Sequence, residues 1–244
     1  MDVAFILLRT GVMPSAEAVA REALRYGFKL IPAGDGDGKP LSFTIEGGGP
    51  FLAMLIDAPH PDAARTPAGP TAADAEDIKD CKAHVIVTAM SLKGTVRQRD
   101  AQMAGLAAAI AAASDAVGVQ LAHGILFHKA QLYCEMAALA LESGELPAEF
   151  AVDITVASEP GERMSFLTHG MPRYGREEFF ITCPVQGKGA LGFIFDMTRW
   201  MLTDKQKQLP TGDTVGRSAE EKVVVQRVPN PTGRGGEVIR LDLP

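Results

Sequence analysis

Hydrophobic and polar positions follow two different periods along this chain. Apolar residues that recur every three or four positions predict amphipathic helices, and short apolar or alternating runs predict strands. Helices are expected over residues 15–26, 98–114, 128–143 and 190–202. Strands are expected over residues 3–9, 28–31, 41–46, 50–57, 83–90, 116–121, 150–157, 164–169, 177–183, 222–228 and 237–242.

The order of these elements predicts an α+β fold. Strands and helices do not alternate strictly, and hairpins recur, so we expect a mixed, largely antiparallel sheet or sheets covered by helices. A loose echo between the β-α-β-β opening and the later β-α units is consistent with two ferredoxin-like halves. The residues themselves contain no repeat, so this arrangement stays open.

A segment rich in proline, alanine and aspartate divides the chain. Residues 59–82 contain almost no large apolar side chain, so we expect them to form a solvated connection. The predicted organisation is an N-terminal β-α-β-β unit at residues 1–58, this connection, and a main α+β unit at residues 83–244. We expect all three to form one compact domain.

Charge and cysteine content narrow the functional classes. The 244 residues include 24 basic and 30 acidic side chains, and the net charge of -6 argues against binding to nucleic acid or to an anionic membrane. Cys81, Cys134 and Cys183 lie far apart and are odd in number, which favours reduced thiols over a disulfide framework or a zinc ribbon. The apolar run near the N-terminus is only six residues long, too short for a signal sequence or a membrane span. We therefore expect a cytoplasmic protein.

Residues 164–182 hold the densest group of chemically active side chains. Arg173 and Arg176 are suited to a carboxylate or phosphate, with His169 as a proton carrier and Tyr174 as a stacking platform. The plainer interpretation is a hairpin bent at two glycines, with surface ion pairs that contribute little stability. These four residues are the candidates for ligand binding, and no residue is assigned a catalytic role.

Two glycine-containing motifs resemble known ligand loops. The motif GKGALG at residues 187–192 matches the dinucleotide pattern, but the polar residues 203–212 do not supply the second strand of that fold. The segment DGDG at residues 35–38 begins like a calcium loop, but Glu46 could close such a loop only if Gly38 lay two positions later. A helix-entry turn and a hairpin turn are the favoured interpretations.

Two histidines form the remaining candidate metal site. His123 and His128 lie five residues apart, and Glu135 follows on the next helix. No third histidine or cysteine is placed on the same element, and a zinc site needs more ligands than these. No metal and no cofactor is therefore predicted, and whether these two histidines ever meet a metal stays open.

Several short patterns occur in a fixed order after residue 83. They are HVIVTA at 84–89, AVGVQLAHG at 116–124, LTHG at 167–170, YGREE at 174–178, GDTVG at 212–216 and EKV at 221–223. Together they resemble the bacterial family catalogued as domain of unknown function 4261. The resemblance covers residues 83–244 well and the first half loosely. It implies a bacterial, cytoplasmic protein, it transfers no catalytic residue, and by analogy it favours a partner of other proteins.

These observations lead to two hypotheses about function. The first is a non-catalytic protein that binds a partner protein or acts in an accessory, immunity-like role. The alternative is a small-molecule enzyme or sensor that binds an anionic ligand at His169, Arg173 and Arg176. The sequence does not predict the oligomeric state or the identity of a partner.

Overall fold

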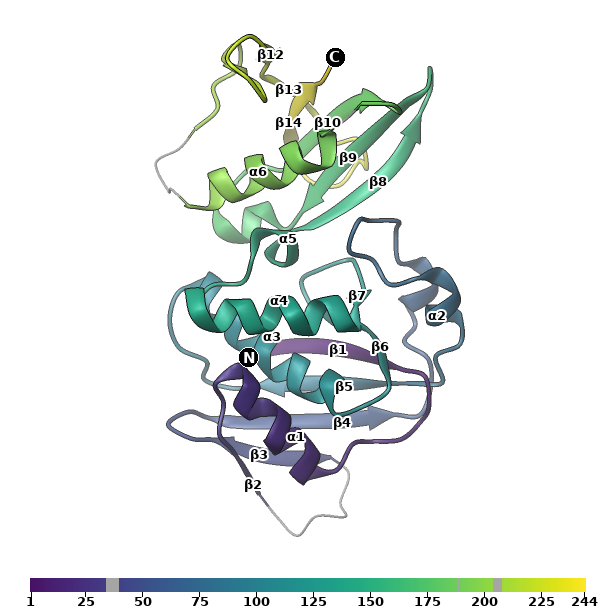
Figure 1. The fold of residues 1–244 in the computed structure, drawn as a ribbon, viewed down its shortest axis with the longest axis vertical. Helices are drawn as coiled ribbons and strands as arrows, with labels where there is room; N and C mark the ends of the chain where they lie inside the picture. Colours follow the sequence, from purple (N-terminus) through teal and green to yellow (C-terminus); the bar gives the residue numbers. More distant parts are fainter. Residues whose placement is uncertain (34–39, 188, 204–207) are drawn as a thin grey trace. The chain divides into compact units, whose positions relative to one another are not determined.

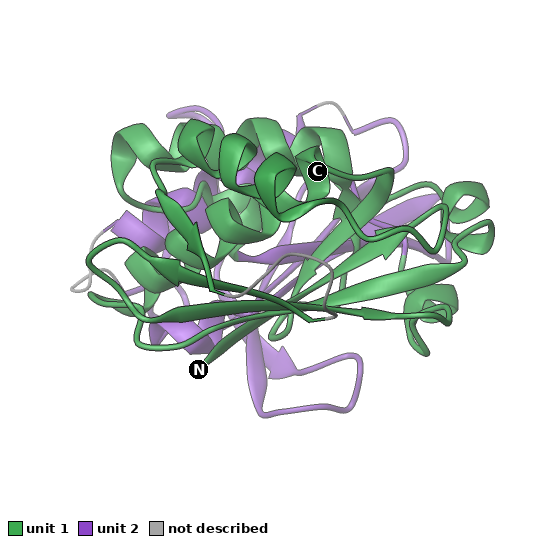
Figure 2. Cartoon of the chain, turned by 90° about the horizontal axis from the view of Figure 1, so that it is seen from below, with its two compact units in different colours: residues 1–67, 71–151 green, residues 68–70, 152–244 purple. Residues whose placement is uncertain are grey.

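The computed structural model describes residues 1–33, 40–187, 189–203 and 208–244, and it divides the chain into two compact units. Unit 1 contains residues 1–67 and 71–151, and unit 2 contains residues 68–70 and 152–244 (Figure 2). Each unit combines helices with its own sheet, which confirms the α+β class (Figure 1). The strand orders of the two sheets do not repeat one another, so the ferredoxin-like halves are not confirmed.

Unit 1 is built on a seven-stranded antiparallel sheet with the order β2-β3-β4-β5-β1-β6-β7. Its strands are β1 (Asp2–Leu8), β2 (Leu30–Pro32), β3 (Leu41–Ile45), β4 (Pro50–Ile56), β5 (Ala83–Ala89), β6 (Ala116–Leu121) and β7 (His128–Lys129). Alternate residues of the central strands are fully buried, among them Ala4 and Ile6 in β1 and Val85 and Val87 in β5. These side chains form the main core of the unit.

One face of this sheet is covered by helices (Figure 2). The helices of unit 1 are α1 (Ala16–Ala23), η1 (Leu24–Tyr26), η2 (Ala63–Arg65), α2 (Ala75–Lys79), α3 (Val96–Ala112), α4 (Ala130–Ser143) and α5 (Ala148–Ala151), of which α1, α3 and α4 cover that face. The longest, α3, starts at a capping box in which Thr95 and Gln98 bond to each other's backbone N–H groups. Local capping chemistry therefore sets where this helix begins.

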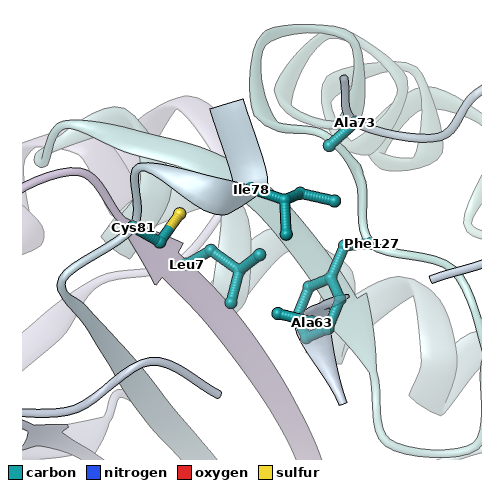
Figure 3. Packing of buried hydrophobic residues seen from close by; sticks show 6 residues of the cluster. All are labelled: Leu7, Ala63, Ala73, Ile78, Cys81 and Phe127. Carbon is teal, nitrogen blue, oxygen red and sulfur yellow. The ribbon is translucent and has the colours of Figure 1, made fainter. Parts of the chain in front are cut away.

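The segment at residues 59–82 is exposed in part, but some of its side chains are buried. It contains η2 and α2, and it places Ala63, Ala73, Ile78 and Cys81 against Leu7 and Phe127 in a second small core (Figure 3). Most of these side chains are small, so the segment lacks a strong hydrophobic pattern but packs closely on the sheet.

The division between units also lies elsewhere than the sequence suggests. Residues 1–58 do not stand apart, because β4 pairs with β5 along its length and β5 pairs with β1. The boundary falls between residues 151 and 152 instead. Strands that are distant in the chain pair with one another, and this pairing places residues 1–58 and the strand β5 in one sheet. No local sequence pattern indicates such pairing.

Unit 2 is built on a five-stranded mixed sheet with the order β13-β14-β10-β9-β8. Its strands are β8 (Asp153–Glu159), β9 (Arg163–His169), β10 (Phe179–Pro184), β13 (Gln226–Pro229) and β14 (Glu237–Asp242), and only the β10–β14 pair is parallel. The remaining elements are η3 (Met171–Tyr174), α6 (Ala190–Thr203) and the paired strands β11 (Thr214–Val215) and β12 (Val223–Val224).

Two expected strands begin or end differently from their sequence patterns. The strand expected at residues 150–157 starts only at Asp153, because Phe150 and Ala151 both donate their N–H groups to Pro147 O at 2.9 Å in the turn of α5. The strand expected at 222–228 is interrupted at Val225, whose N–H donates to Asp213 O at 2.8 Å.

In the described parts of the chain, no helix combines the length and the apolar character needed to cross a bilayer.

Candidate functional site

Residues 164–182 form a corner of unit 2 at which β9 passes through η3 into β10. Gly170 and Gly175 flank η3 with φ angles of 117° and 73°, a backbone region that glycine enters at least cost. The carboxylate of Glu178 accepts hydrogen bonds from Thr168 Oγ1 at 2.6 Å and from Gly170 N–H at 2.7 Å. Burial raises the pKa of Glu178, and these donors oppose that rise. A half-buried carboxylate thus anchors the corner.

His169 lies on the opposite face of β9 from Thr168, because neighbouring residues of a strand point to opposite sides. Its Nε2 atom lies 3.0 Å from Thr155 Oγ1 on β8, and the register pairs it with the buried Asp153. Burial lowers the pKa of His169, and the nearby Asp153 carboxylate opposes this change. Burial therefore favours the neutral form of this imidazole.

The other three sequence candidates lie beyond the end of β9. Arg173 and Tyr174 belong to η3, Arg176 follows it, and all three side chains are partly exposed. The structure thus brings the four candidates to one corner, but it holds His169 from β8 and anchors the turn through Glu178, which the sequence did not single out. The cavities described below are lined by other residues.

The acidic residue before Glu178 has a different partner. Glu177 accepts two hydrogen bonds from the guanidinium of Arg227 in β13, at 2.9 and 2.8 Å. Arg227 also donates to Leu209 O at 3.1 Å. Glu177 therefore ties the corner to the neighbouring chain segment from its exposed side.

The two candidate metal-binding histidines are held by different groups. His128 is buried, with Nδ1 at 2.8 Å from Thr71 Oγ1 and its ring centroid 4.8 Å from that of Phe150. His123 lies 4.0 Å from the buried carboxylate of Asp100. Among the described residues, no three His, Cys, Asp or Glu side chains gather closely enough to hold a metal ion.

Of the two glycine-containing motifs, the structure describes only the one at residues 187–192, apart from Lys188. Residues 35–38 lie outside the described residues, whereas Glu46 is described and pairs with Lys29 Nζ at 2.6 Å. The motif at residues 187–192 leads into α6 and supplies its first three residues. Its last glycine, Gly192, lines a cavity in unit 2.

The face of the unit 1 sheet that α1, α3 and α4 do not cover carries a row of partly exposed apolar side chains. We define the open face as Val3, Phe5, Ile31, Leu52, Met54 and Ile86, which the strand registers place on one side of the sheet. Ile31 is 48% exposed and Met54 is 42% exposed. Among the described positions of β1 to β5 on this side, none is Asp, Glu, Lys or Arg.

The small core of residues 59–82 covers only one end of this face. Phe5 packs against that core, and its ring centroid lies 4.7 Å from that of His60, whereas Met54 sits two strands away. The sequences of β1 and β4 contain apolar residues at both odd and even positions, so apolar side chains lie on both sides of these strands. Such runs are typical of strands buried on both sides, so the pattern predicts that something covers the second side.

Two cavities complete the candidate sites. In unit 1, a cavity of about 390 Å³ opens beside the start of α3 and is lined by Tyr26, Phe28, Lys93 and Gln102 among others. Ser91 precedes this helix with a φ of 63°, an unusual backbone for a residue other than glycine. In unit 2, a cavity of about 600 Å³ lies beside α6. The motif at residues 187–192 borders the unit 2 cavity through Gly189 and Gly192, whereas no motif named above borders the unit 1 cavity.

Comparison with known proteins adds no relative to this description. No protein-family model, curated protein sequence or solved structure matches the chain.

Proposed function

We propose that this chain is a non-catalytic, accessory protein that binds a partner protein through the open face of unit 1. The observation that carries the proposal is a sheet face on which most side chains are apolar and partly exposed and on which the described positions of β1 to β5 carry no Asp, Glu, Lys or Arg. Interface cores are depleted of charged residues, and a contiguous exposed apolar patch on a soluble fold usually marks an interaction site. The partner we expect presents an apolar surface of its own.

A cytoplasmic and bacterial setting is part of the same proposal. The three cysteines are free thiols, and burial raises the pKa of Cys81 to about 11, so this thiol is a poor nucleophile. The net charge of -6 supports a partner other than nucleic acid. The ordered patterns that resemble domain of unknown function 4261 support an immunity-like or accessory role.

The alternative of an anionic ligand at His169, Arg173 and Arg176 stays a prediction. The hydrogen bonds described for His169 and Glu178 go to the protein's own groups, which supports a structural role for the corner.

The test is a photo-reactive side chain placed on the open face. Met54 is replaced by a photo-cross-linking amino acid in cells that naturally make the chain, and Leu139, which is 49% exposed on α4, is the matched control. We expect one partner protein to be captured from position 54 and not from position 139. A second substitution, Thr88→Lys, puts a charge on the open face between β1 and β4 and is expected to abolish that capture while leaving the circular dichroism spectrum unchanged.

Equal capture from positions 54 and 139 would overturn the proposal, as would capture that survives Thr88→Lys. Capture of a second copy of this chain alone would also overturn it, because the open face would then be a self-association surface.

A further inference from the structure

The cavity beside α6 has a wall of large apolar side chains. Phe193, Met197 and Trp200 line it from the helix, and Val215 lines it from β11. Its volume of about 600 Å³ lies in the range of small-molecule sites, which are mostly apolar and carry a few polar groups. The cavity belongs to unit 2 alone, so it is independent of the open face of unit 1.

The chain's single tryptophan forms part of this wall. Trp200 is 37% exposed, although tryptophan is a residue whose large ring is normally well covered. An indole face at a cavity favours a flat aromatic partner, since offset stacking adds attraction beyond the burial of area.

Gly192 keeps the cavity open on the helix side. A Cβ atom built at this position meets no heavy atom of the described neighbouring residues within 4 Å. In α3, by contrast, a Cβ at Gly105 would lie 2.7 Å from Phe28, so that glycine is required by packing. No neighbour in the described structure requires glycine at position 192. The missing side chain at this position leaves space in front of the cavity.

The charged groups around the cavity are compensated by the protein itself. Asp196 pairs with Arg199 at 2.9 Å. Arg217 is bound through its guanidinium to the carboxylate of Glu221, with Nε 2.9 Å from Oε2. A ligand with a net charge would have to compete with these pairs, so the cavity is better suited to an uncharged molecule.

We propose that this cavity binds an uncharged, flat aromatic ring system that stacks on Trp200. Binding of such a ring would bury the exposed part of the indole and fill the space in front of Gly192.

The fluorescence of Trp200 reports whether the cavity is occupied, because the chain has no other tryptophan that contributes to the emission. The full chain is titrated with adenine and with benzimidazole, two uncharged planar ring systems, while tryptophan fluorescence is recorded. Cyclohexanol, an apolar ring that is not flat, and inorganic phosphate, an anion, serve as comparison probes. We expect a saturable change in emission with at least one planar ring and with neither comparison probe.

Three variants separate cavity binding from surface binding. Gly192→Leu places a side chain in the open space and is expected to weaken binding of the planar ring about tenfold or more. Gly236→Leu adds the same side chain at another glycine with open surroundings, outside the cavity, and is expected to leave the affinity unchanged. Trp200→Leu, measured by calorimetry, is expected to lose the binding heat.

Absence of a saturable response to both planar rings would overturn the proposal. An equal response to cyclohexanol or to phosphate would overturn the assignment to uncharged aromatic ligands. An unchanged affinity in Gly192→Leu, with unfolding curves that show an intact fold, would place the binding outside this cavity and would also overturn it.

Discussion

At the scale of single residues, burial decides what adjacent side chains do. Glu177 and Glu178 are neighbours of the same chemical type, yet Glu177 makes a partly exposed pair with Arg227 while Glu178 accepts hydrogen bonds inside the corner. Burial raises the pKa of Glu178, and the hydrogen-bond donors around its carboxylate oppose this rise by stabilising the charged form. Sequence patterns do not distinguish such neighbours.

We expect Glu178→Ala to destabilise the protein by about 1–3 kcal/mol, since it leaves the Thr168 hydroxyl and the Gly170 N–H without their acceptor. The matched change Glu177→Ala removes an exposed ion pair and is expected to cost about 1 kcal/mol or less. Urea unfolding curves of both variants measure the difference. A cost for Glu177→Ala equal to or above that of Glu178→Ala would show that the corner is not held by Glu178.

At the scale of elements, one face of the unit 1 sheet is covered at one end and exposed at the other. Around Leu7 of β1 and Val117 of β6 it is covered by the small core of residues 59–82, and toward β4 and β2 it carries the exposed side chains of Met54 and Ile31. The same strand pattern therefore serves a packed surface at one end and an exposed surface at the other. Coverage is a property of the segment that lies on the strands, not of the strands themselves.

This contrast predicts opposite effects for two apolar truncations on the same face. Ile78→Ala opens a space between α2 and Leu7 and is expected to lower the free energy of unfolding by about 2 kcal/mol. Met54→Ala removes a side chain that is 42% exposed and is expected to change it by about 0.5 kcal/mol or less. Chemical denaturation followed by circular dichroism provides both values, and similar costs would mean that the open face is covered in solution.

At the scale of the whole molecule, the chain contains two sheets, each with its own core. The strands of unit 1 all come from residues 1–151, while those of unit 2 come from residues 152–244, to which residues 68–70 add a backbone contact from Ala68 O to Val156 N at 2.9 Å.

A fragment of residues 1–151 is expected to fold cooperatively, because it keeps all seven strands of its sheet and the helices that cover them. The control fragment, residues 83–244, follows the boundary suggested by the sequence and removes both neighbours of β5, which are β1 and β4. We expect residues 83–151 of this fragment to show no cooperative unfolding and no amide protection, whereas residues 152–244 keep the five strands of their own sheet. Urea unfolding and amide hydrogen exchange test both fragments, and the reverse outcome would mean that the division between residues 151 and 152 is not a folding boundary.

Some features of this protein were determined by the sequence itself. The α+β class, most strands and the long helices follow from periods of two and of three to four residues, and helix starts such as Thr95 follow from capping chemistry within a few positions. The sequence also located the corner that contains His169, Arg173, Tyr174 and Arg176, because glycines and charged residues cluster there. All of these signals are local, so one stretch of chain is sufficient to produce them.

Only the tertiary structure decided how these stretches meet. It paired Met54 with Ile86, placed Ile78 over Leu7, gave Glu178 the donors of Thr168 and Gly170, and put Trp200 and Val215 around one cavity. Except at the corner itself, the groups in each of these contacts lie more than ten residues apart. Their meeting depends on strand order and packing, which arise from the whole chain and leave no signature in a short sequence window.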